Sequence, residues 1–413
     1  MEAQLHDSLV TLFESKLSTQ MLLNLETCSR CGICTPACHA YASMPLAKYA
    51  PAYRAEVVRR IYKRYFTKQG RFMPVLGEAK DITDAALVEL KEAAYSCTGC
   101  RRCMVYCPFG IDTQQIMSIA KLLLIGAQAE PETLSMLADM SVSKGENIDA
   151  LKEGFLSGIK RLEDQVVEKW RSQGEHPIPT DVVGADVLYV ALAGAHSIIP
   201  AAAVFNAAGE KWSLSFFEAV NFGAFVGDPT KTRLILDRIV NEAKRLKVKE
   251  VCICECGTAV RVAKQLKDAP FAVVGLTEMH ARYLRQGRIK LRKLPGSYTY
   301  HDPCQIARNG GVYDEPRYIL RHLVEDFREM SPDPKYNWCC GGGGGLVAMG
   351  EETLEFRMQS AKVKAEQMRG SKAEVVVTAC ENCHTQLSDL NRHYALGQRV
   401  VFLSSLVADA LIP

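Results

Sequence analysis

The chain has 413 residues, of which 48% are hydrophobic and 23% charged, and its formal net charge is +3. This length allows two or three domains, and the composition is that of a folded globular protein, not of a disordered one. The small net charge argues against a dedicated nucleic-acid binder. We therefore expect no nucleic-acid partner.

Sixteen cysteines would indicate disulfides in a small secreted protein, but this chain is large and carries no secretory signal. Residues 1–25 are expected to form an amphipathic helix. The long uncharged stretch 187–209 is interrupted by His196, Pro200 and Asn206, so we expect a strand (187–193), a loop and a helix (199–208) instead of a membrane span. The expected location is the reducing cytoplasm, at the inner face of the membrane through a partner subunit.

Eight cysteines near the start of the chain form two runs with the spacing C-x2-C-x2-C-x3-C. The first cysteine run is Cys28, Cys31, Cys34 and Cys38, and the second is Cys97, Cys100, Cys103 and Cys107. This spacing is typical of a ferredoxin with two cubane 4Fe–4S clusters, in which the fourth cysteine of each run ligates the other cluster. Cluster 1 would use Cys28, Cys31, Cys34 and Cys107, and cluster 2 would use Cys97, Cys100, Cys103 and Cys38. Two zinc sites are the alternative, although zinc motifs usually pair short C-x2-C units.

The long segment between the two runs contains helix-period stretches at 55–65 and 83–95. A basic helix is expected from Arg54, Arg59, Arg60, Lys63, Arg64, Lys68 and Arg71, with only Glu56 opposing them. It could face anionic lipid or a membrane subunit. A solvated helix surface is the alternative.

The rest of the chain is expected to be a connector followed by a repeat. Residues 126–182 are expected to form helices and loops, ending in a turn-rich stretch at 173–180. From residue 183 the chain shows strand, helix, loop, helix and strand twice, over 183–295 and 296–413. The second unit includes expected helices at 316–329 and 354–368 and a strand at 374–379. The predicted fold is multidomain α+β: an α-helical two-cluster ferredoxin domain (1–125), followed by two pseudo-twofold-related α/β halves.

A second group of cysteines lies in the last unit, at expected strand ends and loops. It consists of Cys304, Cys339, Cys340, Cys380 and Cys383, and five glycines, residues 341–345, follow the pair. Such a glycine run fits a backbone that passes close to a bulky cofactor or adopts positive φ. A phosphate-binding loop and a flexible linker are the alternatives, but no Lys-Ser/Thr follows the glycines.

This pattern resembles the cysteine-rich CCG domain of heterodisulfide reductase, and the whole chain resembles the ferredoxin–CCG fusion that forms its D subunit. It is most similar to the cytoplasmic iron–sulfur subunits of sulfate-reducer membrane complexes: the K subunit of the sulfite-reduction-associated complex, the F subunit of the high-molecular-weight cytochrome complex and the B subunit of the tetraheme-cytochrome complex. The resemblance rests on residues 54–66, 97–112, 219–227, 241–257 and 301–304.

The resemblance implies a noncubane 4Fe–4S cluster held by the five cysteines of the last unit. In the parent family such clusters hold and cleave a disulfide. The gap between Cys340 and Cys380 exceeds the usual spacing slightly, so a third cubane or a zinc ion stays open. The first half has Ala193 and residues 221–223 where a full CCG half would have its cysteines, which excludes a second noncubane cluster there.

Three further residues are candidates for catalysis. Alignment of Glu250 with Glu374 places Cys256 at the position of Cys380, where it could exchange with a disulfide or be an inert vestige. His301 and His384 flank cluster cysteines and are expected to donate hydrogen bonds or deliver protons. Cys252 and Cys254 alternate along a strand and are expected in the core.

The function expected from this resemblance is electron transfer in a membrane-bound redox complex. Partners would be an integral-membrane b-type cytochrome subunit and other subunits, and the substrate a small-molecule disulfide or trisulfide, or a small sulfur-carrier protein. A relay subunit without its own substrate is one alternative. An iron–sulfur subunit of glycolate, lactate or glycerol-3-phosphate oxidation, or a structural zinc protein, are the others.

Overall fold

The computed structural model describes residues 3–412 except 171–177, 193, 268 and 333. The chain divides into two compact units, and neither unit is a continuous stretch of sequence. Unit 1 contains Met1–Leu137, Phe222–Pro229 and Trp338–Glu366. Unit 2 contains Ala138–Asn221, Thr230–Asn337 and Gln367–Pro413.

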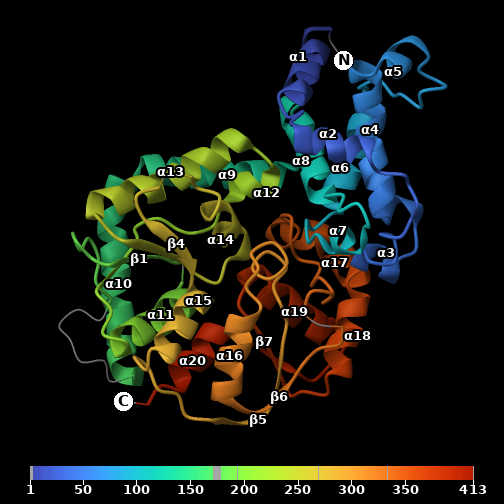
Figure 1. Cartoon of the computed structure of the whole chain (residues 1–413). Coiled ribbons are helices and arrows are strands. Elements are labelled where there is room, and N and C mark those ends of the chain that lie inside the picture. The colour runs from blue at the N-terminus through green and yellow to red at the C-terminus, as the bar shows by residue number, and fades with distance from the viewer. Residues whose placement is uncertain (1–2, 171–177, 193, 268, 333, 413) are drawn as a thin grey trace. The chain divides into compact units, whose positions relative to one another are not determined.

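Unit 1 is built from helices and loops, without a strand among its described residues. Its elements (Figure 1) are α1 (Ala3–Glu14), α2 (Thr19–Glu26), α3 (His39–Ser43), η1 (Ala47–Tyr49), α4 (Pro51–Phe66), α5 (Lys68–Phe72), α6 (Asp84–Tyr95), α7 (Arg102–Tyr106), α8 (Thr113–Gly126), α12 (Phe222–Val226), η2 (Val347–Thr353) and α17 (Leu354–Ser360). Two further helices, α9 (Glu132–Glu146) and α18 (Lys362–Gly370), cross the unit boundary.

Helix α8 forms the core of unit 1. It begins at the Asp112 cap, whose side chain accepts the amides of Gln114 and Gln115, and it packs against α1, α2, α4 and α6. Its Gly126 allows close contact, since a Cβ there would lie 2.6 Å from a methyl of Leu12. Because α8 follows the second cysteine run directly, its burial fixes the position of those loops.

Unit 2 contains two four-stranded parallel sheets with the same strand order. They are β2-β1-β3-β4 and β6-β5-β7-β8. The strands are β1 (Val187–Val190), β2 (Trp212–Leu214), β3 (Glu250–Ile253), β4 (Ala272–Gly275), β5 (Leu294–Tyr300), β6 (Val324–Arg328), β7 (Val375–Thr378) and β8 (Arg399–Phe402). The helices are α10 (Ile148–Trp170), α11 (Ala195–Ala207), α13 (Pro229–Leu246), α14 (Gly257–Ala263), α15 (Leu276–Arg285), α16 (Asp314–Leu323), α19 (Glu381–His393) and α20 (Leu403–Asp409). The mixed fold with parallel sheets agrees with expectation, and the pseudo-twofold relation and the domain boundaries stay predictions.

Several expected elements differ from the structure. The N-terminal helix is two helices, because the Ser18 side chain accepts the Met21 amide and starts α2. The helix expected over 316–329 ends at Leu323 and continues as strand β6, and the one over 354–368 is interrupted at Ala361. Helix α11 begins before residue 199, and β1 ends at Val190. Residues 1–2, 173–177 of the turn-rich stretch, and Ala193 lie outside the described part of the chain.

Candidate functional site

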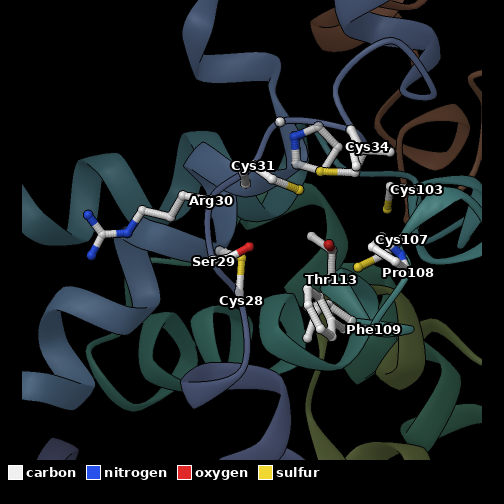
Figure 2. A pocket seen from close by; sticks show the side chains of 16 residues that line it. Cys28, Ser29, Arg30, Cys31, Cys34, Cys103, Cys107, Pro108, Phe109 and Thr113 are labelled. Atoms are coloured by element: carbon white, nitrogen blue, oxygen red, sulfur yellow. The ribbon is translucent and has the colours of Figure 1, made fainter.

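The first of two thiol-lined cavities in unit 1, cavity 1, contains cysteines from both runs (Figure 2). It has an empty volume of about 440 Å³, and its cysteines are Cys28, Cys31, Cys34, Cys103 and Cys107. The loop between Cys28 and Cys34 curves round the cavity because Arg30 and Gly32 have φ of 59° and 79°. Figure 2 shows the Arg30 side chain pointing away from the thiols. The structure therefore brings together the four cysteines expected for cluster 1.

Cavity 2 contains the remaining cysteines of both runs and shares Cys103 with cavity 1. Its empty volume is about 360 Å³, and its cysteines are Cys38, Cys97, Cys100 and Cys103. Cys38 is the N-cap residue of α3, and Cys107 is the C-cap residue of α7, so each run ends at a helix terminus that directs its last thiol elsewhere. These are the four cysteines expected for cluster 2.

The donor set of both cavities fits iron–sulfur clusters. Burial raises the pKa of the Cys97 and Cys103 thiols, and that of Cys34 to about 11. Such thiols stay protonated unless a cation compensates the thiolate charge, and iron supplies that compensation. All sixteen cysteines are free of disulfides. Four thiols alone would also suit a zinc ion, but the spacing C-x2-C-x2-C-x3-C of each run is typical of iron–sulfur proteins and not of zinc motifs.

A buried arginine, Arg54 of α4, lies against cavity 2. Its Nη1 donates to Cys38 Sγ at 3.3 Å, and its Nε and Nη2 donate to Ser96 Oγ and O at 3.1 and 3.0 Å. Only 2% of Arg54 is exposed. Among the described residues no carboxylate pairs with it, so its charge faces the thiols of cavity 2.

The basic helix expected from residues 54–71 consists of α4 and α5, and Arg54 and Arg59 are not available to face lipid or solvent, because both are buried. Arg59 is also buried, donates to Leu25 O at 2.7 Å, and forms an ion pair with Glu56. The Glu56 carboxylate also contacts Arg30 Nε at 3.1 Å. Arginines that look alike in the sequence therefore divide into structural residues and surface residues.

The segment that carries the Cys-Cys pair belongs to unit 1 and packs on the second cysteine run. Thr98 Oγ1 lies 3.4 Å from Cys339 Sγ. A Cβ on Gly344 would lie 2.7 Å from Cys97 O, and one on Gly343 would lie 2.9 Å from Thr98 O. Glycines are therefore required here because the run passes close to the backbone of the second cysteine run. The expected positive φ is present, with 72° at Gly344, and the expected close approach to a cofactor stays a prediction.

Two polar residues at this contact were not identified from the sequence. His39 is buried, and its ring nitrogens make no hydrogen bond within the described part of the chain. Its ligand atom lies within 4.8 Å of those of Cys100 and Cys339. Lys121 of α8 donates to Phe225 O at 2.5 Å and to Gly344 O at 3.1 Å, which fixes the glycine run from the other side. The only sequence signal for His39 is that it replaces the proline usual after the fourth cysteine.

In unit 2 the strand register relates the thiols of the two halves. Leu188 pairs with Val251 and Tyr298 with Val375, so alignment of these pairs places Cys256 at the position of Cys380. The same register places Ala259 at the position of Cys383. Ala193, expected at the position of Cys304, lies outside the described residues, so its correspondence stays a prediction.

Cys256 and Cys380 occupy matching helix N-termini, but their surroundings differ. Burial raises the pKa of Cys256 to about 12, and a hydrogen bond from Cys383 lowers the pKa of Cys380. A Cβ on Gly257 would lie 3.7 Å from Cys380 Sγ, so the chain at Cys256 runs close to Cys380. Cys252 and Cys254 are buried in the core, as expected.

The two histidines expected near these thiols have different environments. His301 is buried directly after β5, and its amide donates to Val377 O at 2.9 Å. His384 stacks on Phe402 with ring centroids 4.1 Å apart, and burial lowers its pKa. Their expected hydrogen-bonding or proton-delivery roles stay predictions.

A buried ion pair supports the loop that carries Cys304. Arg317 donates to both carboxylate oxygens of Asp302 at 2.8 and 2.9 Å, and it also pairs with Glu329 at 2.7 Å. Asn337 Nδ2 donates to the same carboxylate at 3.3 Å. The last cysteine group is divided between the units: Cys304, Cys380 and Cys383 belong to unit 2, and Cys339 and Cys340 to unit 1.

Comparison with known proteins gives two family matches and several relatives. Residues 24–111 match the 4Fe-4S dicluster domain, and residues 298–388 match the cysteine-rich domain CCG. An Hdr-like menaquinol oxidoreductase iron-sulfur subunit 2 of Archaeoglobus fulgidus is 29% identical over 82% of this chain and 70% of its own length. The D subunit of the dihydromethanophenazine:CoB–CoM heterodisulfide reductase of Methanosarcina barkeri is 27% identical over 96% of both chains. An EtfAB:quinone oxidoreductase of Syntrophomonas wolfei is 24% identical over 89% of this chain and 55% of its own.

None of the described helices combines the length and the apolar character that crossing a membrane requires.

Proposed function

Because the chain belongs to the family of ferredoxin–CCG proteins that includes the heterodisulfide reductase D subunit, we propose that it is an iron–sulfur electron-transfer subunit of an oxidoreductase complex. The observation that carries this proposal is the pair of cavities, each lined by at least four cysteines taken from both cysteine runs. Clusters bound there would accept and donate single electrons. The cysteines would hold these clusters, and the neighbouring residues would set the polarity and charge around them.

The proposed ligands follow the two cavities and the CCG match. Cubane 1 is held by Cys28, Cys31, Cys34 and Cys107, and cubane 2 by Cys97, Cys100, Cys103 and Cys38. A third, noncubane cluster is held by Cys304, Cys339, Cys340, Cys380 and Cys383. Of the two cubane sites, cavity 2 is the one whose cysteine run contacts the Cys339 segment, through Thr98. We therefore place cubane 2 between cubane 1 and the third cluster in the relay.

The proposed substrate and partners come from the relatives. One is named for menaquinol and another for a heterodisulfide. We propose that this chain exchanges electrons between a membrane b-type cytochrome subunit, at the cytoplasmic face, and a disulfide or thiol at the third cluster. A small sulfur-carrier protein is an equivalent substrate, and the sulfate-reducer complexes named above are the proposed setting.

The roles of Cys256, His301 and His384 belong to this proposal. Cys256 lies close to Cys380 and is the thiol placed to exchange with a bound disulfide. Burial raises the pKa of Cys256 to about 12, so the proposed exchange requires a neighbouring group to accept its proton as the thiolate forms. His301 and His384 would donate hydrogen bonds or protons at the same place.

A specific observation favours the relay without its own substrate as a second candidate. When Glu250 is aligned with Glu374, Ala259 falls at the position of Cys383, and we infer that the first half does not supply a second cluster to flank a disulfide. In that case the third cluster passes electrons on and does not react with sulfur.

The test uses the full chain, purified and reconstituted without oxygen. We expect about twelve iron atoms per chain, and about eight in a Cys383→Ser variant. Added disulfide should change the electron paramagnetic resonance spectrum of the third cluster if it reacts there, and should leave it unchanged for a relay. The matched variant Cys256→Ser should keep all the iron. A wild-type chain that binds clearly fewer than eight iron atoms would contradict the proposal.

A further inference from the structure

Four apolar side chains are exposed together at the last residue of α5 and in the loop that follows it. The exposed fractions are 81% for Phe72, 49% for Met73, 89% for Val75 and 72% for Leu76, with Pro74 between them. We call residues 72–76 the apolar tip. Single exposed apolar residues are ordinary, but a contiguous group marks a surface that another body covers.

The backbone holds the apolar tip outward. The amides of Gly77 and Ala79 donate to Met73 O and Pro74 O, both at 2.8 Å. At the base of the loop, a Cβ on Gly77 would lie 3.0 Å from Gly70 Cα, so the returning chain contacts helix α5 there. Figure 1 shows the chain after α5 extending as a loop before it returns to α6. The apolar side chains are therefore exposed because a hydrogen-bonded turn and the close contact between Gly70 and Gly77 fix the conformation of the loop.

A run of basic residues precedes the apolar tip in the chain. The basic collar consists of Arg60, Lys63, Arg64, Lys68 and Arg71, and the sequence has no acidic residue between Glu56 and Glu78. Lys68 and Arg71 are exposed beside Phe72. Glu78 pairs with Lys63 at 3.3 Å and Asp81 with Arg64 at 2.6 Å. Glu56 pairs with Arg60 at 3.7 Å. Lys68 and Arg71 form no ion pair among the described residues, so these two side chains supply the excess positive charge beside the tip.

We propose that the apolar tip and the basic collar dock unit 1 on an anionic lipid surface. The tip would enter the headgroup region, and the collar would lie against the lipid phosphates. The charge of the collar favours this occupant, because a neutral or basic protein surface would not be complementary to it. The proposal rests on the proposed function, in which the partner subunit is in a membrane.

Docking through this loop would also determine which cubane receives electrons from the membrane first. Glu78, which follows the tip, pairs with Arg30 of the cavity 1 loop at 2.5 Å. The second cysteine run, by contrast, contacts the Cys339 segment. The docked surface is therefore linked to the site of cubane 1, which is the end of the relay that would receive electrons from the membrane.

The experiment measures co-sedimentation of the cluster-loaded chain with vesicles. Vesicles of phosphatidylglycerol and phosphatidylcholine should bind the wild type at least tenfold more tightly than vesicles of phosphatidylcholine alone. The triple variant F72S/V75S/L76S and the double variant K68Q/R71Q should each bind the anionic vesicles at least tenfold more weakly. Val88→Ser, which alters a side chain 70% exposed on α6, is the matched control and should bind like the wild type.

A second variant gives a readout that loss of folding cannot imitate. The fluorescence of Phe72→Trp should shift to shorter wavelength with anionic vesicles and not with neutral ones. No shift, or equal binding by the wild type and both multiple variants, would overturn the proposal. Protection of the tip by a co-purified membrane protein, without vesicle binding, would assign the tip to a protein and would also overturn it. Iron content and cluster spectra, measured on the same samples, report on the proposed function separately.

Discussion

Cavity 1 and cavity 2 are built from the same cysteine motif, yet the arginines that lie beside their thiols have different surroundings. Beside cavity 1, Arg30 is 40% exposed and pairs with Glu56 and Glu78, and Cys31 is exposed. Beside cavity 2, Arg54 is buried and contacts Cys38 without a carboxylate partner among the described residues. The motif determines which atoms hold a cluster, and the surroundings determine how readily the cluster accepts an electron.

The physical basis of the difference is screening. A cation in the interior acts through a low effective dielectric, and an exposed cation paired with carboxylates is screened by water, salt and its own partners. Positive charge near a cluster favours its reduced form, which carries one more negative charge. We therefore expect Arg54 to raise the reduction potential of cubane 2 more than Arg30 raises that of cubane 1.

The largest expected effect comes from Arg54→Met. Loss of the buried charge and of the donor to Cys38 should lower the midpoint potential of cubane 2 by about 59 mV or more, a tenfold change in the ratio of reduced to oxidised cluster. Redox titration followed by electron paramagnetic resonance measures both cubanes in one sample. Arg54→Lys, which keeps the charge, should recover part of the shift. An equal shift of both cubanes would remove the proposed distinction.

An intermediate effect is expected on cluster loss. Because Cys31 is exposed and Cys38 is buried, an oxidant with a chelator should remove cubane 1 several times faster than cubane 2. Native mass spectrometry at successive times counts the remaining iron, and the cluster spectra identify the site. Faster loss of cubane 2 would show that exposure of the thiols does not control lability.

The smallest effect is expected from Arg30→Gln. Its shift of the cubane 1 potential should be well below that of Arg54→Met and should vanish in high salt. The hydrogen bond and ion pair with Arg30 hold the pKa of Glu78 at about 2, with help from Lys63. This pairing is present above the ordinary carboxyl pKa and is lost as pH falls toward 2. In Arg30→Gln the Glu78 pKa, measured by carbon-detected NMR on the metal-free chain, should move upward.

The cysteine spacing predicted both cavity compositions, because ligand geometry is encoded locally. The environment was not predictable in the same way. Arg54 and Arg60 read alike in a basic helix, and only the packing of α4 against its neighbours buries the first. Thr98 and His39 gain their positions from the segment at Cys339, which lies far later in the chain, and no local pattern signals that contact.

The edge strands of the sheets show a second limit of sequence reasoning. Residues 324–328 continue the helical spacing of Ile319, Leu320 and Leu323, so the sequence indicates one long helix. The structure ends α16 at Leu323 and pairs β6 with β5 in parallel. That pairing uses backbone groups from a strand far away in sequence, and tertiary context therefore outweighs the local period.

Unit 1 is completed only by residues 338–366, which the ribosome adds after most of unit 2. Until then Lys121 lacks Gly344 O, and Thr98 lacks Cys339. The residues that line both cavities all lie between Cys28 and Gln114, so the nascent N-terminal segment can bring its thiols together early. The contact of its second cysteine run with Cys339 forms only when the chain is nearly finished.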